Sequence, residues 1–218
     1  MLLLALMPPP QPLISATAAL PLLTRLSPQP YMMASDAPPQ FIFTANAATK
    51  WVVTAAQTGA VIARRDLVAP FVVVGSIGAA FATKALKKAI NQQRPDGAPF
   101  TDPGMPSSHA LVATFAAAAW AAYCVATAAP RAYALLLLGA AACVSWLRVA
   151  TGYHTWAQIG VGAGLGAVGA LGWMAFGAEL LAKGLLAPRA AATAVYTAYV
   201  GGSVLFVAKS VRKWSSKY

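Results

Sequence analysis

The chain has 218 residues, of which 59% are hydrophobic and only 10% are charged, and its formal net charge is +11. This composition is typical of a membrane protein and excludes an ordinary soluble domain. The basic residues stand at the ends of apolar runs rather than on one polar face, which argues against a nucleic-acid partner and favours anionic lipid headgroups and phosphate substrates.

The first 40 residues differ in composition from the rest of the chain. They are rich in Pro, Ala, Ser and Thr, and contain one basic residue, Arg25, and one acidic residue, Asp36. The apolar run at residues 2–7 is too short for a secretory signal, and no positive region precedes it. An acid-poor leader indicates an organelle transit peptide, with a plain disordered tail as the alternative. We therefore expect a leader at 1–40 and one membrane-embedded domain at 41–218.

Six apolar segments follow the leader. The first, at 51–63, reaches the roughly 20 residues of a membrane span only if 41–49 is added. The others lie at 67–86, 110–129, 132–147, 159–178 and 190–208. The basic and aromatic tail at 209–218 is typical of an interfacial anchor. The sequence therefore predicts an all-α integral membrane bundle of about six transmembrane helices.

Two glycine pairs in the fifth segment, Gly160/Gly164 and Gly162/Gly166, have the spacing that lets membrane helices approach closely. Cys124 and Cys143 fall within apolar runs. We expect both cysteines to be packing residues, with no disulfide framework and no metal set.

Both histidines of the chain lie in short polar blocks between the apolar segments. Lys87 ends the second segment, His109 opens the third, Arg148 ends the fourth and His154 opens the fifth. Because successive segments cross the membrane in opposite directions, these four residues reach the same face. Each also stands at a helix end, where ionisable groups are tolerated in a membrane.

The block Met105-Pro106-Ser107-Ser108-His109 is suited to opening a helix, because serine hydroxyls can accept bonds from the free N–H groups of the first turn. A helix start also attracts anions through those amides and the helix dipole. The alternative is a serine-capped membrane helix with an interfacial histidine. Lys87 and Arg148 could likewise be only membrane-flanking cations.

Taken together, the blocks resemble the phosphatidic acid phosphatase type 2 superfamily, which includes lipid phosphate phosphatases and acid haloperoxidases. Its pattern is Lys, six residues and Arg-Pro, then Pro-Ser-Gly-His, then Ser-Arg, five residues, His, three residues and Asp. The matching residues here are Lys87, Arg94, Pro95, Pro106, Ser107, His109, Arg148 and His154. Ser108, Leu147 and Gln158 replace the usual Gly, Ser and Asp. The forms of these blocks are similar to those of dolichyl-diphosphate phosphatases and, more closely, of the plastid epsilon-type lipid phosphate phosphatases.

The resemblance implies a catalytic mechanism. His154 would be the nucleophile and form a phosphohistidine, while His109 would protonate the leaving alcohol and later activate water. Lys87, Arg94 and Arg148 would neutralise the phosphate, with Ser107 and Ser108 as further donors.

Residue types alone extend this picture. Gln158 lies four residues after His154 at a helix start, so its amide could accept a bond from the imidazole and fix the tautomer; capping or packing is the alternative. With three cations present, no metal and no cofactor are expected. Asp96 and Asp102 are expected to be turn residues, because Asp102-Pro103-Gly104 is a turn signal.

We therefore expect a membrane enzyme that removes phosphate from a lipid phosphate, with phosphatidic acid as the first substrate and diacylglycerol as its product. A polyprenyl or dolichyl diphosphate phosphatase is the alternative enzyme, and a non-catalytic membrane protein that binds lipid phosphates is the alternative outside enzymes. Tyr153 and Trp156 are expected to be interfacial anchors.

The leader favours a chloroplast membrane over the endoplasmic reticulum. Outside the leader, the remaining basic residues divide seven to five in favour of the face that carries the blocks. This excess favours the stromal or cytosolic side for this face. Nothing in the sequence indicates the oligomeric state.

Overall fold

The computed structural model describes residues 38–183 and 188–215, and within these ranges it forms six α-helices and no strand. The helices are α2 (Gln40–Arg64), α3 (Val68–Ile90), α4 (Ser108–Ala126), α5 (Arg131–Ala150), α6 (Trp156–Ala182) and α7 (Pro188–Ser215). Five of them, all except α2, are long and apolar enough to cross a membrane. The prediction of an all-α integral membrane bundle is thereby confirmed.

Helix α2 fills the position of the first predicted apolar segment but is less apolar than α3, α4, α5 and α6. It carries Lys50 near its middle, and two of its polar residues, Asn46 and Thr49, are buried. The predicted leader at 1–40 lies outside the described residues except for its last three positions.

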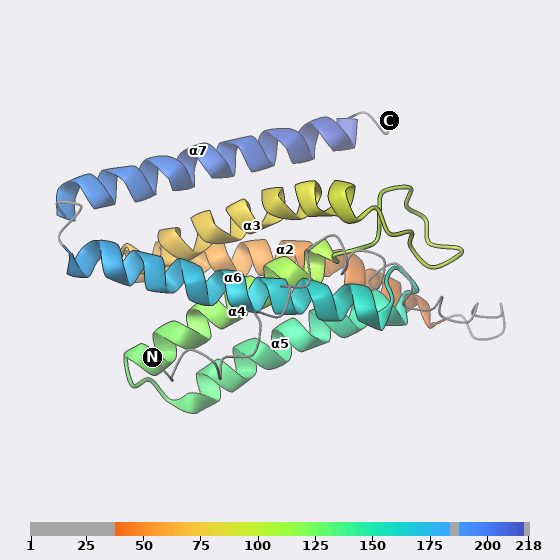
Figure 1. Ribbon diagram of the computed structural model, residues 1–218, viewed down its shortest axis with the longest axis horizontal. Helices are drawn as coiled ribbons and strands as arrows, with labels where there is room; N and C mark the ends of the chain where they lie inside the picture. The colour runs from red at the N-terminus through yellow and green to blue at the C-terminus, as the bar shows by residue number, and fades with distance from the viewer. Residues whose placement is uncertain (1–37, 184–187, 216–218) are drawn as a thin grey trace, which may run out of the picture.

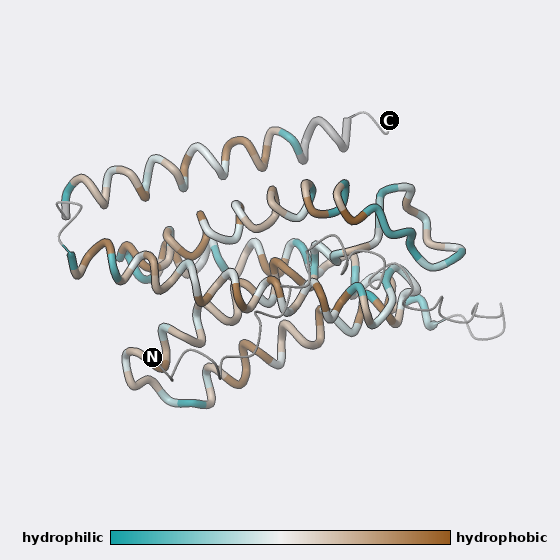
Figure 2. The backbone as a smooth tube through the Cα atoms, in the orientation of Figure 1, coloured by the Kyte–Doolittle hydropathy of each residue, from teal (hydrophilic) through white to brown (hydrophobic). Residues whose placement is uncertain are grey.

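The helices lie side by side in an up-and-down bundle (Figure 1). Helix α4 is central and packs against α3, α5 and α6, while α2 covers α3 and α5. Helix α7 lies at the edge of the bundle, where its main neighbour is α3. The hydropathy of the residues agrees with this arrangement. The long loop between α3 and α4 is hydrophilic, whereas the helices are largely apolar (Figure 2).

A close approach of α4 and α6 holds the centre of the bundle together. A Cβ atom added to Gly166 would lie 2.3 Å from the backbone oxygen of Leu111, and one added to Gly162 would lie 2.7 Å from that of Ser107. A Cβ atom added to Gly160 or to Gly164 would have no neighbouring atom within 4 Å. Of the two predicted glycine pairs, only Gly162/Gly166 therefore makes a helix contact.

The buried core lies between α3, α4 and α6, where Val72, Phe115, Ala119 and Ala170 pack together. Many large apolar side chains of the outer faces are exposed instead, as expected for helices that face lipid. Both cysteines have free thiols. Cys124 is partly buried, but Cys143 is exposed on the outer face of α5, so the prediction that both are packing residues is wrong for Cys143.

Candidate active site

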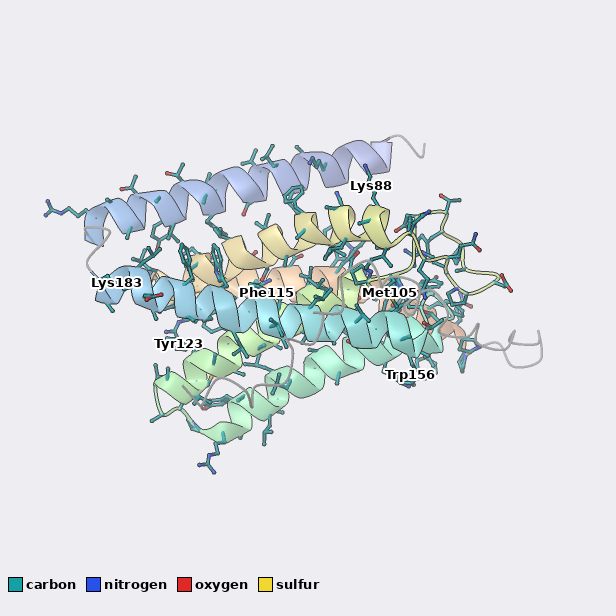
Figure 3. All side chains as sticks on the ribbon, in the orientation of Figure 1. Lys88, Met105, Phe115, Tyr123, Trp156 and Lys183 are labelled. Carbon is teal, nitrogen blue, oxygen red and sulfur yellow. The ribbon has the colours of Figure 1, made fainter. Side chains whose placement is uncertain are left out.

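The predicted site residues converge at one end of the bundle. This end is formed by the end of α3, the loop 91–107, the start of α4 and the turn between α5 and α6. In Figure 3, Met105 and Trp156 lie at this end, whereas Tyr123 and Lys183 lie at the other. The expectation that the polar blocks reach the same face is therefore confirmed by the fold.

His154 lies in a turn that folds back on the end of α5. The backbone N–H groups of Tyr153 and His154 both donate to the carbonyl oxygen of Arg148, at 3.1 Å, and Gly152 takes the positive φ of 69° that this turn needs. The imidazole is 3% exposed. This local fold brings the His154 ring and the Arg148 guanidinium to one site, although their side chains leave the chain six residues apart.

The hydrogen bonds of His154 define its tautomer. Nδ1 lies 3.0 Å from Oε1 of Gln158, and Nε2 lies 3.0 Å from Nη1 of Arg94. An amide oxygen only accepts and a guanidinium only donates, so the proton is on Nδ1 and Nε2 presents its lone pair. Burial, together with the charges of Arg94 and Arg148, lowers the pKa of His154 against the opposing bond to Gln158. The imidazole is therefore neutral and its Nε2 can act as a nucleophile.

Gln158 is almost fully buried, and every polar atom of its amide is used. Its oxygen also accepts a bond from the N–H of Thr155, and its Nε2 donates to Oε1 of Gln92 at 3.1 Å and to the carbonyl oxygen of Gln93 at 2.8 Å. Its own N–H donates to the Thr155 hydroxyl, which completes a capping box at the start of α6. Gln158 thus contacts the imidazole and caps the helix at the same time, so the two alternatives considered for it are compatible.

Lys87 and Arg94 share one carboxylate, that of Asp102. Nζ of Lys87 lies 2.6 Å from Oδ2 of Asp102, and Nη2 of Arg94 lies 2.9 Å from Oδ1 and 3.0 Å from Oδ2. Lys87 also donates to the carbonyl oxygen of Pro103, and Arg94 donates through Nε to that of Asp102 at 2.9 Å. The prediction that Asp102 is only a turn residue is wrong, because its side chain ties both cations to the loop.

The charge of Asp102 is maintained by these two partners. Burial raises the pKa of its carboxyl, but the hydrogen bonds and charges of Lys87 and Arg94 outweigh this effect and lower the pKa below its ordinary value. Asp96, in the same loop, is exposed and has no such pairing among the described contacts. The two acidic residues of the loop therefore differ in their relation to the site.

Arg148 is buried rather than snorkelling, with 5% of its surface exposed. Its Nη1 donates to Oδ1 of Asn46 on α2 at 3.2 Å, while its Nε is buried and has no hydrogen-bond partner in the described part of the chain. Its guanidinium carbon lies 4.8 Å from the ring centre of Tyr153. Tyr153, expected to be an interfacial anchor, therefore packs on a site cation; Trp156 is 55% exposed, as an anchor should be.

The aromatic ring of Phe100, from the loop 91–107, also lies over the cations. It is 4.8 Å from the guanidinium carbon of Arg94 and 6.0 Å from that of Arg148, and it stands edge-on to the ring of Tyr153 with the ring centres 5.0 Å apart. Aromatic faces attract cations and restrict their movement. Phe100 and Tyr153 thus limit the directions in which the two guanidinium groups can point.

Ser107 is the N-cap residue of α4, but its hydroxyl makes no capping bond. Its Oγ is buried without a partner among the described residues, and its N–H donates to the carbonyl oxygen of Gln158 at 3.0 Å. The expectation that the serine hydroxyl caps the helix is therefore wrong for Ser107. Ser108 is the first residue of α4, and His109 follows it, half-buried, in the first turn.

The charged groups that act on His109 are Arg148, Lys50, Arg94 and Lys87. Lys50 belongs to α2, one helical turn after Asn46, so α2 presents both residues on one face. The structure thus connects most of the predicted site residues and adds Asn46, Lys50, Phe100 and Asp102 to their surroundings, while no described contact ties the Ser108 side chain to them. A polar residue inside an apolar segment is a functional signal in membrane proteins, and Asn46 could have been found that way.

This arrangement is suited to an anion with several oxygens. Buried polar groups without partners are costly, and Ser107 Oγ and Arg148 Nε are donors of this kind at the end of the bundle that also holds Lys87 and Arg94. A neutral imidazole, whose Nε2 lone pair faces Nη1 of Arg94 at 3.0 Å, lies among them. Within residues 38–183 and 188–215, no group of three or more His, Cys, Asp or Glu side chains is placed to hold a metal ion.

Comparison with known proteins identifies a family whose model matches this chain and two proteins that are similar to it. The family model described as the PAP2 superfamily matches residues 68–181, slightly more than half of the chain. Lipid phosphate phosphatase epsilon 2, chloroplastic, of Arabidopsis thaliana is 34% identical over 148 residues, which cover 65% of this chain and 51% of that protein. Lipid phosphate phosphatase epsilon 1, chloroplastic, of the same plant is 29% identical over 173 residues, covering 78% of this chain and 62% of that protein. The chain thus spans less than two thirds of the length of either relative, and no solved structure matches it significantly.

Proposed function

Since the chain belongs to the PAP2 superfamily, as its three sequence blocks predicted, we propose that it is a membrane phosphatase that removes the terminal phosphate from a lipid phosphate. The substrate we propose is phosphatidic acid, and the products are diacylglycerol and inorganic phosphate. One observation carries the proposal: the Nε2 lone pair of the neutral His154 lies among Lys87, Arg94 and Arg148, where an anionic phosphoryl group would bind. The names of the two Arabidopsis relatives support the lipid phosphate class of substrate.

In the first step we propose that Nε2 of His154 attacks the phosphorus while the bond from phosphorus to the leaving oxygen breaks. His109, which takes up a proton from solvent when the negatively charged phosphate offsets the surrounding cations, gives this proton to that oxygen, so the lipid leaves as an alcohol. The Nδ1 proton of His154 stays in place throughout, because Gln158 Oε1 accepts it at 3.0 Å and stabilises the positive ring of the phosphohistidine. Arg94 releases Nε2 as the phosphoryl group arrives and donates to a phosphate oxygen instead.

In the second step His109 takes a proton from water, whose oxygen attacks the phosphorus as the bond to Nε2 breaks. Phosphate leaves and both histidines return to their starting state. Lys87, Arg94 and Arg148 offset the negative charge on the phosphate oxygens in both steps. Because these cations can supply that role, we propose that turnover needs no divalent metal.

The membrane we propose is that of the plastid, with its envelope as the site. Both similar relatives are named chloroplastic, and the leader composition agrees with import. The endoplasmic reticulum remains the alternative. The excess of basic residues on the face that carries the site favours an orientation toward the stroma or cytosol.

The test is phosphate release by the purified protein in detergent micelles, measured in parallel on phosphatidic acid and on a polyprenyl diphosphate. We expect the higher kcat/KM on phosphatidic acid, no loss of activity in EDTA, and loss of turnover in His154→Ala with membrane insertion retained. Higher activity on the diphosphate would identify the alternative enzyme. Phosphate binding without turnover on either lipid would identify a non-catalytic lipid-phosphate-binding protein, and activity lost in EDTA and restored by Mg²⁺ would contradict the metal-independent mechanism.

A further inference from the structure

The carboxylate of Asp102 occupies the two cations that a phosphate monoester would need. We propose that Asp102 is a specificity-determining residue: it competes with bound anions for Lys87 and Arg94, and yields to a phosphate monoester but not to the phosphodiester headgroups of the surrounding membrane. The proposal rests on the proposed function, because it concerns the anion that this same site accepts.

The geometry of the loop makes Asp102 a direct competitor. Its two oxygens lie 2.6 Å from Nζ of Lys87 and 2.9 and 3.0 Å from Nη2 of Arg94, which is how a phosphate would engage an ammonium and a guanidinium at once. The backbone carbonyls of Asp102 and Pro103 take further donors of the same two cations. A phosphate oxygen cannot use these donors until the carboxylate has moved away.

Arg94 connects this competition to the nucleophile. Its Nη1 donates to the carbonyl oxygen of Tyr153 at 3.0 Å and lies equally close to Nε2 of His154, while its Nη2 and Nε are held by Asp102. As long as Asp102 holds the guanidinium in this position, Arg94 covers the lone pair of His154. Release of Asp102 therefore frees both a phosphate ligand and the attacking nitrogen.

The side chain of Asp102 is placed where it can leave. It is 53% exposed, whereas those of Lys87 and Arg94 are each 8% exposed. Ion pairs with an exposed partner are weak, because water screens them and competes for the carboxylate. Lys87 and Arg94 stay within the site, where the Arg94 guanidinium can turn away from Nε2 of His154, and the loop segment with Asp102 is the part that gives way.

The charge of the arriving anion then decides the exchange. A phosphodiester headgroup carries about one negative charge and replaces one carboxylate charge by another, so it gains little over Asp102 in Coulomb attraction. A phosphate monoester near neutral pH carries about −1.5 to −2 charges and three free oxygens. It can satisfy Lys87 and Arg94 together and still offer an oxygen to the unpartnered Ser107 Oγ and Arg148 Nε.

This discrimination has a purpose in a membrane. The site lies at the end of the bundle, in a surface where diester headgroups are present at very high local concentration. Uncompensated cations at that place would be occupied by those headgroups. Asp102 keeps diester headgroups, with one negative charge, from binding the two cations, and it leaves the cations available to a phosphate monoester of higher charge.

The experiment compares Asp102→Asn with Asp96→Asn in the purified full-length protein. Both changes remove one negative charge from the same loop, but Asp96 is exposed and takes no part in the described site contacts. Binding of inorganic phosphate is measured by calorimetry, which needs no turnover. We expect Asp102→Asn to bind phosphate about three- to tenfold more tightly, as loss of a weak competing ion pair implies, and Asp96→Asn to bind it like the unchanged protein.

A second measurement addresses headgroup selection. Hydrolysis of phosphatidic acid is followed in mixed micelles that contain phosphatidylglycerol or, as a neutral reference, phosphatidylcholine. Phosphatidylglycerol should inhibit Asp102→Asn several-fold more than the unchanged protein, and Asp102→Glu, which keeps the carboxylate, should retain most of the discrimination. Asp102→Ser gives the same charge removal if the Asn variant does not fold.

The sign of the result decides between competition and simple fastening of the loop. If Asp102 only anchors the loop, its removal loosens Lys87 and Arg94 and weakens phosphate binding. Weaker or unchanged phosphate binding in both Asp102→Asn and Asp102→Ser therefore overturns the proposal. Equal inhibition of Asp102→Asn and the unchanged protein by phosphatidylglycerol also overturns it. Tighter phosphate binding without any hydrolysis of phosphatidic acid would instead support the role of Asp102 and contradict the proposed function.

Discussion

Replacing Gln158 by Glu changes one amide nitrogen for an oxygen beside the proposed nucleophile. The variant keeps the length of the side chain and an acceptor at Nδ1 of His154, where the present distance is 3.0 Å. It adds a negative charge that favours the imidazolium form. An opposite charge at this range raises a pKa by about 1–3 units, so the pKa of His154 should rise by that amount from its present lowered value.

The sign of the effect on activity follows from the proposed mechanism. Neutral His154 is the attacking form, so kcat/KM falls as the pH decreases through the pKa of this residue in the free enzyme. In Gln158→Glu the acidic limb should therefore move to higher pH by about 1–3 units. Gln158→Ala should lower kcat/KM at every pH, because the ring loses the acceptor that holds its tautomer.

The same change has a separate cost in stability. The amide nitrogen now donates to the carbonyl oxygen of Gln93 at 2.8 Å and to Oε1 of Gln92 at 3.1 Å, and a carboxylate oxygen can donate to neither. The free energy of unfolding should fall by roughly 0.5–1.5 kcal/mol for each of these two hydrogen bonds that is lost. Thermal unfolding of the variants separates this loss from the change in the pH profile.

Thr155→Ala is the matched control for the capping role. It removes the hydroxyl that caps α6 but leaves the contact between Gln158 and the His154 ring in place. We expect a loss of about 1 kcal/mol in stability and an unmoved acidic limb. The reasoning is refuted if the acidic limb of Gln158→Glu stays where it is in the unchanged protein while Gln158→Ala keeps full kcat/KM.

Three further changes test the packing and the leader. Asn46→Leu removes the acceptor of the buried Arg148 and should lower kcat/KM about tenfold, equivalent to about 1.4 kcal/mol, through a higher KM. The control Thr44→Ala, at an exposed position of the same helix, should change neither kcat nor KM. Equal values in both variants would exclude a role for Asn46. Gly166→Ala should lower the unfolding free energy by about 1–3 kcal/mol and reduce activity, because its Cβ atom would meet the backbone oxygen of Leu111. Gly164→Ala should be tolerated, since its Cβ atom would have no neighbour within 4 Å, and similar melting temperatures of the two variants would contradict this packing. Removing residues 1–37, which include none of the site residues, should leave phosphate release intact and abolish import into isolated plastids, and import of the truncated protein would refute the transit-peptide prediction.

The membrane spans and the shared face of the site were predictable because both depend on local information. A run of apolar residues sets a span, and the alternation of spans then decides which helix ends meet. Lys87, His109, Arg148 and His154 each stand at such an end, so their convergence needed no knowledge of side-chain contacts. The helix bounds were less accurate, since α6 continues to Ala182, beyond the predicted end of its apolar segment at residue 178.

The residues that were missed are tied to the site by contacts across the fold. Asn46 meets Arg148 from 102 positions away in the chain, and no local pattern connects them. Asp102 lies in a sequence typical of a turn, and its ion pairs with Lys87 and Arg94 depend on the path of the whole loop 91–107. The serine hydroxyl of Ser107 was expected at the amides of α4, but the carbonyl of Gln158 takes its N–H and the hydroxyl points to no described partner.

The contact between Asn46 and Arg148 also bears on where the functional unit of this fold begins. The family match starts at residue 68, the first residue of α3, and would exclude α2 completely. Yet α2 provides the one described side-chain acceptor of Arg148 and the cation Lys50 that acts on His109. A minimal fragment cut at the matched region would retain every motif residue and lose the support of one of them. Boundaries for chimeras or shortened versions of this protein should therefore be drawn before residue 40. Helix α7, which the match omits and which makes none of the described site contacts, is the helix to vary first.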